Sequence, residues 1–181
     1  MPHDLDCHPD TPAGFPCAIR VTVHRHGAGG LAVHYRVQAD PQSLRLPDPA
    51  PPARSDGLWR HSCCELFAAP EPGGPYREFN FSPSGQWQAY AFSDYRQGGP
   101  LETAAAPDIH RHLDESGFSL TVDLPAPLLP PGPHLALGLT VVLEDNGGGI
   151  SYWALTHAPG KPDFHHPATF ALSLDLPHAR P

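Results

Sequence analysis

Basic residues, long apolar runs and cysteines are all scarce in this sequence. Only 11 of its 181 residues are Lys or Arg, against 19 Asp or Glu, and the formal net charge is −8. The basic residues are scattered, which argues against nucleic acid or an anionic membrane as the main partner. No apolar run approaches the roughly 20 residues of a membrane-spanning helix. These absences favour a globular protein that binds neither nucleic acid nor membranes.

The N-terminus and the cysteines both bear on cellular location. Residues 1–6 lack the basic region followed by an apolar region that marks a secretory signal, so we expect a cytoplasmic protein. Cys7 and Cys17 are ten residues apart in a Pro-rich segment, and Cys63 and Cys64 are adjacent. Neighbouring strand residues point to opposite faces, so the adjacent pair is poorly placed for a disulfide. We expect all four cysteines to be reduced.

Proline, in contrast, is abundant, at 25 of 181 residues. Proline breaks helix interiors, so little helix is expected, and short strands between irregular loops fit better. The length and the apolar content of 40% predict a single globular domain. We assign residues 1–17 to an irregular lead-in, 18–176 to one β-domain and 177–181 to a frayed tail.

Alternation of apolar and polar residues marks the strands. Residues 19–25 and 31–37 alternate on either side of the Gly-rich stretch 26–30, which predicts a hairpin. Further strands are predicted over 62–68, 76–82, 86–93, 118–124, 135–143, 150–156 and 168–174, with residues 97–115 irregular or in a short helical turn. About nine short strands with frequent turns predict an antiparallel sandwich or barrel.

The second hairpin has a defined register. Pro83, Ser84 and Gly85 suit a three-residue turn, because proline and serine fit a type I turn and glycine the left-handed position. This turn pairs Phe81 with Trp87 and Phe79 with Ala89 on the core side, and Asn80 with Gln88 and Glu78 with Tyr90 on the other. A slip by one residue would mix the two faces.

The polar face of this region is the first candidate for chemistry. Trp59 and Glu65 are six residues apart, so a continuous strand places both on one face, while Glu78 and Asn80 share a face of the neighbouring strand. An aromatic plate beside carboxylates and amides is what a sugar needs, because its CH face lies on the ring and its hydroxyls pair with the polar groups. The alternative is that Trp59 is a core residue and the polar residues are a solvated face.

The segment 151–166 is the second candidate. A strand ends near His157, and a loop rich in Pro and Gly then presents Lys161, Asp163 and His165. We interpret this loop as the rim of a binding face, with Trp153 as a possible second aromatic wall. The alternative is a metal site with His157, Asp163 and His165 as ligands.

Catalysis has weaker support. Glu65 and Glu78 are a possible carboxylate pair for glycoside hydrolysis, but sequence spacing fixes no distance between them. The sequence contains no Gly-x-Ser-x-Gly, phosphate-binding loop or dinucleotide-binding glycine motif. We therefore expect a protein that binds a small molecule or an oligosaccharide without catalysis.

Two blocks of the sequence resemble a known superfamily. Asp56-Gly-Leu-Trp59 with Glu65-Leu-Phe67, followed by Glu78-Phe-Asn-Phe-Ser-Pro-Ser-Gly85, resembles the DOMON-like superfamily, and most closely its branch related to the family 9 carbohydrate-binding modules. Residues 151–155 and 160–165 resemble a bacterial DOMON-like group. The resemblance covers most of residues 18–175 and implies a jelly-roll-like β-sandwich with a ligand site on one sheet.

The resemblance also implies roles for individual residues. In sugar-binding relatives, two tryptophans enclose a terminal sugar while acidic and amide side chains bind its hydroxyls. Trp59 and Glu65 match the first tryptophan and a nearby acid, and Trp153 is a candidate for the second tryptophan. Glu78 and Asn80 fall on the strand that supplies further polar contacts.

Other DOMON relatives suggest different partners. Some bind haem b through a methionine and a histidine. Here Met1 is the sole methionine, so two of the 13 histidines would have to serve instead. A haem or metal site, and a polar sheet face that meets another protein, remain alternatives to a carbohydrate-binding face built from Trp59, Glu65, Glu78, Asn80, Gln88, Tyr90, Trp153 and Lys161.

Overall fold

Strands dominate the computed structural model, which describes residues 1–26 and 29–175. Its helices are single 3-10 turns, and none is long and apolar enough to span a membrane. The described strands are β1 (Pro2–Cys7), β2 (Cys17–Arg25), β3 (Leu31–Ala39), β4 (Cys63–Ala69), β5 (Tyr76–Phe81), β6 (Trp87–Asp94), β7 (Gln97–Pro100), β8 (Asp108–Asp114), β9 (Gly117–Leu124), β10 (His134–Glu144), β11 (Ile150–Ala154) and β12 (Leu172–Asp175).

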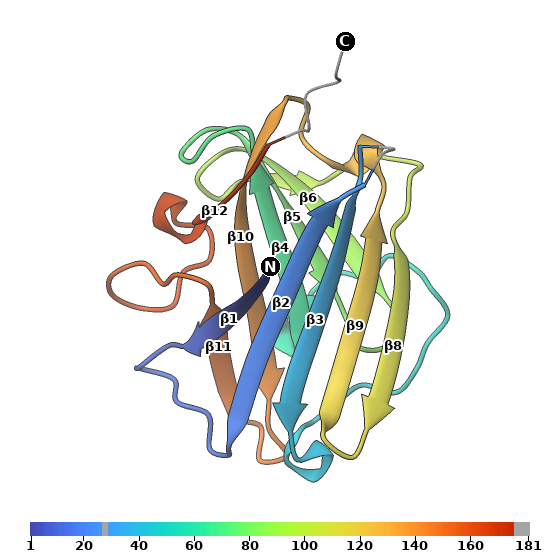
Figure 1. Ribbon diagram of the computed structural model, residues 1–181, viewed down its shortest axis with the longest axis vertical. Coiled ribbons are helices and arrows are strands. Elements are labelled where there is room, and N and C mark those ends of the chain that lie inside the picture. The colour runs from blue at the N-terminus through green and yellow to red at the C-terminus, as the bar shows by residue number, and fades with distance from the viewer. Residues whose placement is uncertain (27–28, 176–181) are drawn as a thin grey trace.

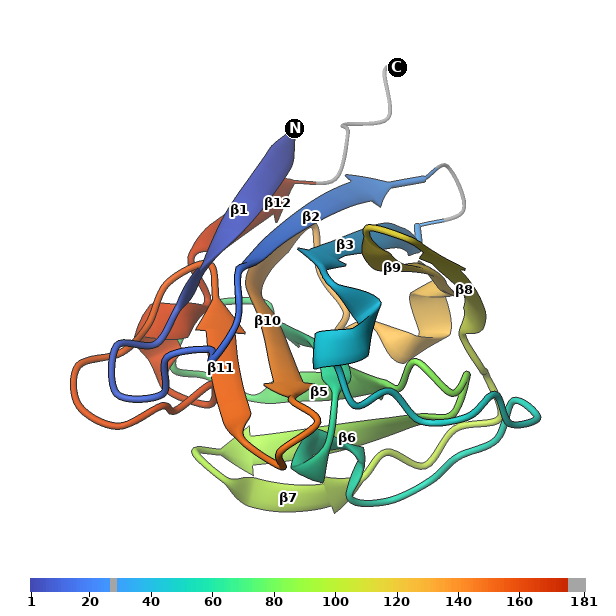
Figure 2. The same ribbon diagram turned by 90° about the horizontal axis from the view of Figure 1, so that it is seen from below.

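These strands form an antiparallel β-sandwich, as predicted (Figure 1). The first sheet has the order β1-β2-β3-β9-β8, and the second has β7-β6-β5-β4-β10-β11, with β12 paired to β10. Strand β1 joins the two sheets, because Pro2–Leu5 pair with β2 while Asp6 and Cys7 pair with β11. Figure 2 shows the two layers edge-on, with β2, β3, β9 and β8 facing β5 and β6.

The sequence underestimated the number of strands, predicting about nine where the described residues form twelve. The expected lead-in 1–17 contains β1, and the expected irregular segment 97–115 contains β7 and β8. All three are short or lie at a sheet edge. They bury few apolar side chains, so they show little of the alternation that identifies a strand in a sequence. The expected tail 177–181 lies outside the described residues.

Both predicted hairpins are confirmed. Strands β2 and β3 pair along their whole length, with Cys17 opposite Ala39 at one end and Arg25 opposite Leu31 at the other. Residues 27 and 28 of their connection lie outside the described part of the chain. The β5–β6 register is the predicted one, with Phe81 opposite Trp87 and Asn80 opposite Gln88. Gly85 has the expected positive φ of 94°.

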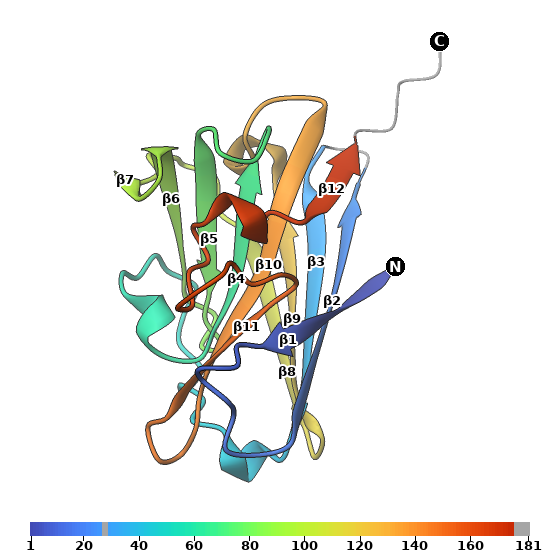
Figure 3. The same ribbon diagram turned by 90° about the vertical axis from the view of Figure 1, so that its left-hand side faces the viewer.

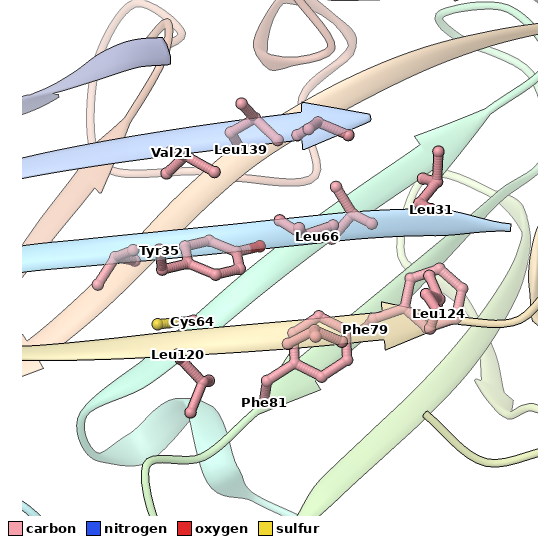
Figure 4. Close-up of a cluster of buried hydrophobic side chains, with 14 of the residues drawn as sticks. Val21, Leu31, Tyr35, Cys64, Leu66, Phe79, Phe81, Leu120, Leu124 and Leu139 are labelled. Carbon is pink, nitrogen blue, oxygen red and sulfur yellow. The ribbon is translucent and has the colours of Figure 1, made fainter. Parts of the chain in front are cut away.

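The core lies between the sheets (Figure 4). Tyr35 on β3 is fully buried there, and its hydroxyl donates to the backbone carbonyl of Glu65 on β4 at 2.9 Å. This hydrogen bond links the first sheet to the second across the core. Cys63 and Cys64 are buried on β4, and all four cysteines are free, as expected.

The outer face of the second sheet is also covered. Phe164 and Phe170, from the segment 155–171 between β11 and β12, pack with Phe67 and Tyr76 in a second apolar cluster. Figure 3 shows this segment in front of β4 and β10. As a result, all seven residues of β4 are buried, on both faces of the strand. Polar residues on this outer face therefore lie in a partly dry environment.

The hydroxyl of Tyr35 provides a test of the link between the sheets. Tyr35→Phe removes the donor and leaves the Glu65 carbonyl short of one partner in the core. We expect the free energy of unfolding to fall by about 1–2 kcal/mol, measured by urea denaturation. Tyr152→Phe is the control, because its hydroxyl has no hydrogen bond to a described residue. Equal stabilities of the two variants would contradict the role of Tyr35.

Candidate functional site

A cavity of about 660 Å³ opens on the outer face of the second sheet. Its floor is formed by side chains from β4, β5, β6, β10 and β11. The rim is formed by the 3-10 helix η2 (Leu58–Arg60), by β7 and by the loop after β11. Its lining residues are Thr11, Asp56, Trp59, Glu65, Phe67, Glu78, Tyr90, Phe92, Arg96, Gly98, Gly99, Pro100, Val142, Tyr152, Lys161, Pro162, Phe164 and His165.

Two buried carboxylates lie at the floor. On the paired strands β4 and β5, Phe67 is opposite Glu78 and Glu65 is opposite Asn80, so the two glutamates are diagonal neighbours on one face. Glu65 is 2% exposed and Glu78 is 6% exposed. Thr140 Oγ1 donates to Glu65 Oε2 at 3.3 Å, and Asn80 Nδ2 donates to Glu78 Oε1 at 2.9 Å.

Burial makes both carboxylates weak acids. It raises the pKa of Glu65 well above the ordinary value, and the nearby charge of Glu78 raises it further, against the hydrogen bond from Thr140. Burial also raises the pKa of Glu78 to about 7, although the hydrogen bond from Asn80 and the charge of Arg96 oppose this change. Two neighbouring carboxylates repel each other when both are ionised, so we expect the pair to retain protons near neutral pH.

Aromatic rings form a continuous lining around these acids. Trp59, at 38% exposed, packs edge-to-face on Tyr90 with ring centroids 5.7 Å apart. Tyr90 lies 6.4 Å from Phe92, which is 5.1 Å from the ring of His165. From there the lining continues through Phe67 and Phe164 to Tyr152, with centroid distances of 5.2, 6.4 and 5.8 Å.

Polar contacts hold the rim in place. Arg96 Nη2 pairs with Asp163 Oδ1 at 2.9 Å, and Tyr95 Oη donates to Asp163 Oδ2 at 2.6 Å, so the loop after β11 is tied to the β6–β7 turn. Partial burial opposes ionisation of Asp163, but these hydrogen bonds lower its pKa. Near Trp59, the Tyr90 hydroxyl donates to Asp56 Oδ1.

His165 connects this rim to the floor. The Tyr76 hydroxyl lies 2.7 Å from His165 Nδ1, and His165 Nε2 lies 3.6 Å from Glu78 Oε2. Burial and the charge of Arg96 lower the pKa of His165 to about 4, although Asp163 opposes them. The imidazole is therefore neutral at physiological pH and leaves the Glu78 carboxylate without a full counter-charge.

The structure brings together six of the residues selected from the sequence, because the cavity is lined by Trp59, Glu65, Glu78, Tyr90, Lys161 and His165. The expected geometry of Trp59 was wrong, however. It does not lie on a strand continuous with Glu65, because η2 ends at Arg60 and β4 begins at Cys63. Gly57, with a φ of 76°, turns the chain so that the tryptophan reaches the rim.

Three other selected residues do not line the cavity. Trp153 is 6% exposed and belongs to the core between the sheets, so it forms no second aromatic wall. Its position opposite Val141 on β10 fixes its side chain to the core face. Asn80 is buried beside Glu78, and the Gln88 side-chain oxygen accepts from Arg54 Nε at 2.8 Å.

The proposed metal ligands do not converge. His157 Nε2 contacts the Asp6 carbonyl at 2.8 Å, while both carboxylate oxygens of Asp163 are engaged by the β6–β7 turn. No group of three or more His, Cys, Asp or Glu side chains in the described part of the chain is arranged to hold a metal ion. The haem alternative stays a prediction.

Several lining residues were not selected from the sequence. Phe67 and Phe92 lie two residues beyond Glu65 and Tyr90 on the same strands, so their period of two could have identified them. Asp56 was part of the quoted motif. Arg96, Phe164 and Thr11 come from turns and loops, where no periodicity indicates which way a side chain points.

Comparison with solved structures finds the same fold. A protein from Bacteroides uniformis to which carbohydrate binding is attributed is 16% identical, with a TM-score of 0.63 over 98% of this chain and 85% of that one. A family 9 carbohydrate-binding module from Caldicellulosiruptor kristjanssonii in complex with cellotriose is 9% identical, with a TM-score of 0.60 over 96% and 82%. Such a module from the same organism in complex with glucose is 10% identical, with a TM-score of 0.56 over 91% and 79%.

Neither a scan against protein-family models nor a search of curated proteins finds a match. At these identities, the structural likeness establishes the β-sandwich fold. The ligand has to be inferred from the cavity itself.

The buried acids predict an unusual pH dependence. A carboxyl whose pKa is higher in the folded than in the unfolded state stabilises the protein at low pH. For Glu78, this stabilisation is lost as the pH rises from its ordinary pKa of 4.5 to its folded-state pKa of about 7. Glu78→Gln removes this loss. The free energy of unfolding of the variant, relative to that of wild type, should therefore rise by about 2–3 kcal/mol from about pH 5 to about pH 8. Urea denaturation at both pH values measures the gain.

The comparison of variant with wild type is needed because His165 acts in the opposite direction. Its lowered pKa makes the protein less stable as pH falls from 6.5 toward 4, and this contribution is present in both proteins. Glu71→Gln, at an exposed turn, is the matched control and should show no such gain. A pH-independent difference between Glu78→Gln and wild type would show that Glu78 ionises normally.

Proposed function

We propose that this protein binds carbohydrate, without catalysis, in the cavity on the outer face of the second sheet. The observation that carries the proposal is the combination, in one open cavity, of a half-exposed tryptophan, an aromatic lining and two buried carboxylates. Ligand sites are concave and largely apolar with a few polar groups, and this cavity has that composition.

Each part of the cavity suits one part of a sugar. Trp59 offers a flat face to the CH groups of a pyranose ring, at the rim where a ligand enters. Glu65 and Glu78 offer carboxyl oxygens to hydroxyl groups. The neighbouring aromatic rings exclude water and so strengthen these hydrogen bonds.

The structural comparisons support the proposal. Two solved structures with this fold hold cellotriose and glucose, and carbohydrate binding is attributed to a third. We propose short glucose-containing oligosaccharides as the first ligands to test. A small ligand buries little surface, so we expect dissociation constants from about micromolar to about millimolar.

Replacement of Trp59 tests this function. Trp59→Ala removes the stacking surface but little of the core, because the side chain is half-exposed. We expect affinity for cellotriose to fall at least roughly tenfold while the fold is retained, measured by isothermal titration calorimetry and circular dichroism.

Leu113→Ala is the control for this experiment, because Leu113 is an exposed apolar residue on β8, in the other sheet. It should leave affinity unchanged. Equal binding by wild type and Trp59→Ala would exclude Trp59 from the site. Absence of binding to any mono- or oligosaccharide at about 10 mM, the weak limit for such sites, would contradict the proposed function itself.

A further inference from the structure

The two floor carboxylates have no cationic partner among the described residues. Glu65 lies beyond 4.0 Å from every described Lys, Arg and His nitrogen, and the nearest such nitrogen to Glu78 is Nε2 of the neutral His165, at 3.6 Å. The Glu65 Oε1 atom accepts no hydrogen bond from a described group, although the residue is only 2% exposed. Buried carboxylates are normally paired with a positive charge.

The positive charges at the rim do not fill this role. The Arg96 guanidinium is engaged by Asp163 at 2.9 Å and by the Tyr95 hydroxyl at 3.3 Å. Lys161 is exposed to solvent at the loop after β11. The floor therefore carries two acidic groups without a cationic partner, while the positive charges of the rim are paired with Asp163 or exposed to water.

The surrounding rings suit a cation as well as an apolar surface. Phe67 and Tyr90 lie on the same strand faces as Glu65 and Glu78, directly opposite or beside them in the sheet. Aromatic faces attract ammonium groups, most strongly where water is excluded.

We propose that the site selects sugars that carry a protonated amine, with the ammonium group seated between Glu65 and Glu78. The proposal rests on the carbohydrate binding proposed above and specifies its ligand class. The ammonium donates to the free carboxylate oxygens, and the sugar ring lies along the aromatic lining toward Trp59. A neutral sugar would occupy the same cavity and pair its hydroxyls with the acids, but it would bring them no positive charge.

Such a ligand must change the protonation of the site. Titratable or charged groups surround the glutamate pair on every side: Cys63 on β4, Tyr76 on β5, Tyr90 on β6, Tyr152 on β11, Asp56 near η2, Arg96 in the β6–β7 turn, and Lys161 and His165 in the loop after β11. Burial raises the pKa of the Cys63 thiol and of the Tyr90 hydroxyl above their ordinary alkaline values, so these groups stay protonated when a ligand binds. The protons available for release near neutral pH are therefore those of Glu65 and Glu78, whose pKa values burial raises from the acidic range. Entry of an ammonium favours ionised carboxylates, so binding should release protons from the protein.

The experiment compares three ligands that differ at one carbon atom: glucose, N-acetylglucosamine and glucosamine. Calorimetric titration at about pH 6, in two buffers of different ionisation enthalpy, gives affinity and the number of protons released. We expect glucosamine to bind at least about tenfold more tightly than the two neutral sugars. We also expect glucosamine to release a substantial fraction of one proton and the neutral sugars to release almost none.

The outcomes separate this inference from the function on which it rests. Glucose binding that equals or exceeds glucosamine binding would overturn the amine preference and leave carbohydrate binding intact. Binding of none of the three sugars would overturn both. Tighter glucosamine binding without proton release would place the amine away from Glu65 and Glu78 and would also contradict the proposal.

Two near-isosteric variants locate the ammonium. Glu65→Gln and Glu78→Gln should each bring the ratio of glucosamine to glucose affinity close to one, because an amide carries no charge. Glu71→Gln, at an exposed turn outside the cavity, should keep the wild-type ratio. If both cavity variants retain the wild-type ratio in folded protein, the proposal is wrong. Circular dichroism verifies folding, and the ratio is read within each variant, so a general loss of affinity does not affect it.

Discussion

Burial of both faces of β4 is the constraint on which the rest of the structure depends. One face carries Cys64 and Leu66 into the core between the sheets, and the other carries Glu65 and Phe67 beneath the segment 155–171. Because the Tyr35 hydroxyl donates to the Glu65 carbonyl from the core side, the backbone beneath the cavity floor is anchored to the core between the sheets. The Glu65 side chain points to the other face of the strand, where it is 2% exposed, so its carboxyl bears the cost of burial.

The cover over the second sheet turns a flat face into a cavity. Gly138 on β10 allows a close approach, because a Cβ at this position would lie 3.2 Å from the Thr169 carbonyl oxygen and 3.3 Å from Phe67 Cβ. Arg96 and Asp163 then tie the other part of the cover to the β6–β7 turn. The space left between these two attachments is where Glu65, Glu78 and their aromatic neighbours meet solvent or a ligand.

The sequence predicted most of the fold and part of the site. The β5–β6 register followed from a period of two and from the turn chemistry of residues 83–85, both of which are local properties. The DOMON-like resemblance predicted a β-sandwich, which the structure and its structural neighbours bear out, while membership of that superfamily stays a resemblance. Strands at sheet edges were missed because they bury too little to show a pattern.

The limits of sequence reasoning are clearest for the tryptophans. Periodicity correctly assigned Trp87 to the core, but it placed Trp59 on a strand where a 3-10 turn positions it instead. Trp153 was expected to face a ligand, yet its register on β11 directs it to the core. Which face of a strand is buried against a partner sheet depends on the whole sandwich, which a local pattern does not contain.

The indole N–H signals of the three tryptophans give the most direct test of the central claim that a ligand binds at the outer-face cavity. In a two-dimensional ¹H–¹⁵N spectrum, addition of a sugar should shift the Trp59 signal progressively, while the core residues Trp87 and Trp153 stay in place. Replacement of Trp59 by Phe assigns the signal. An unchanged Trp59 signal at a sugar concentration that saturates binding would contradict the account.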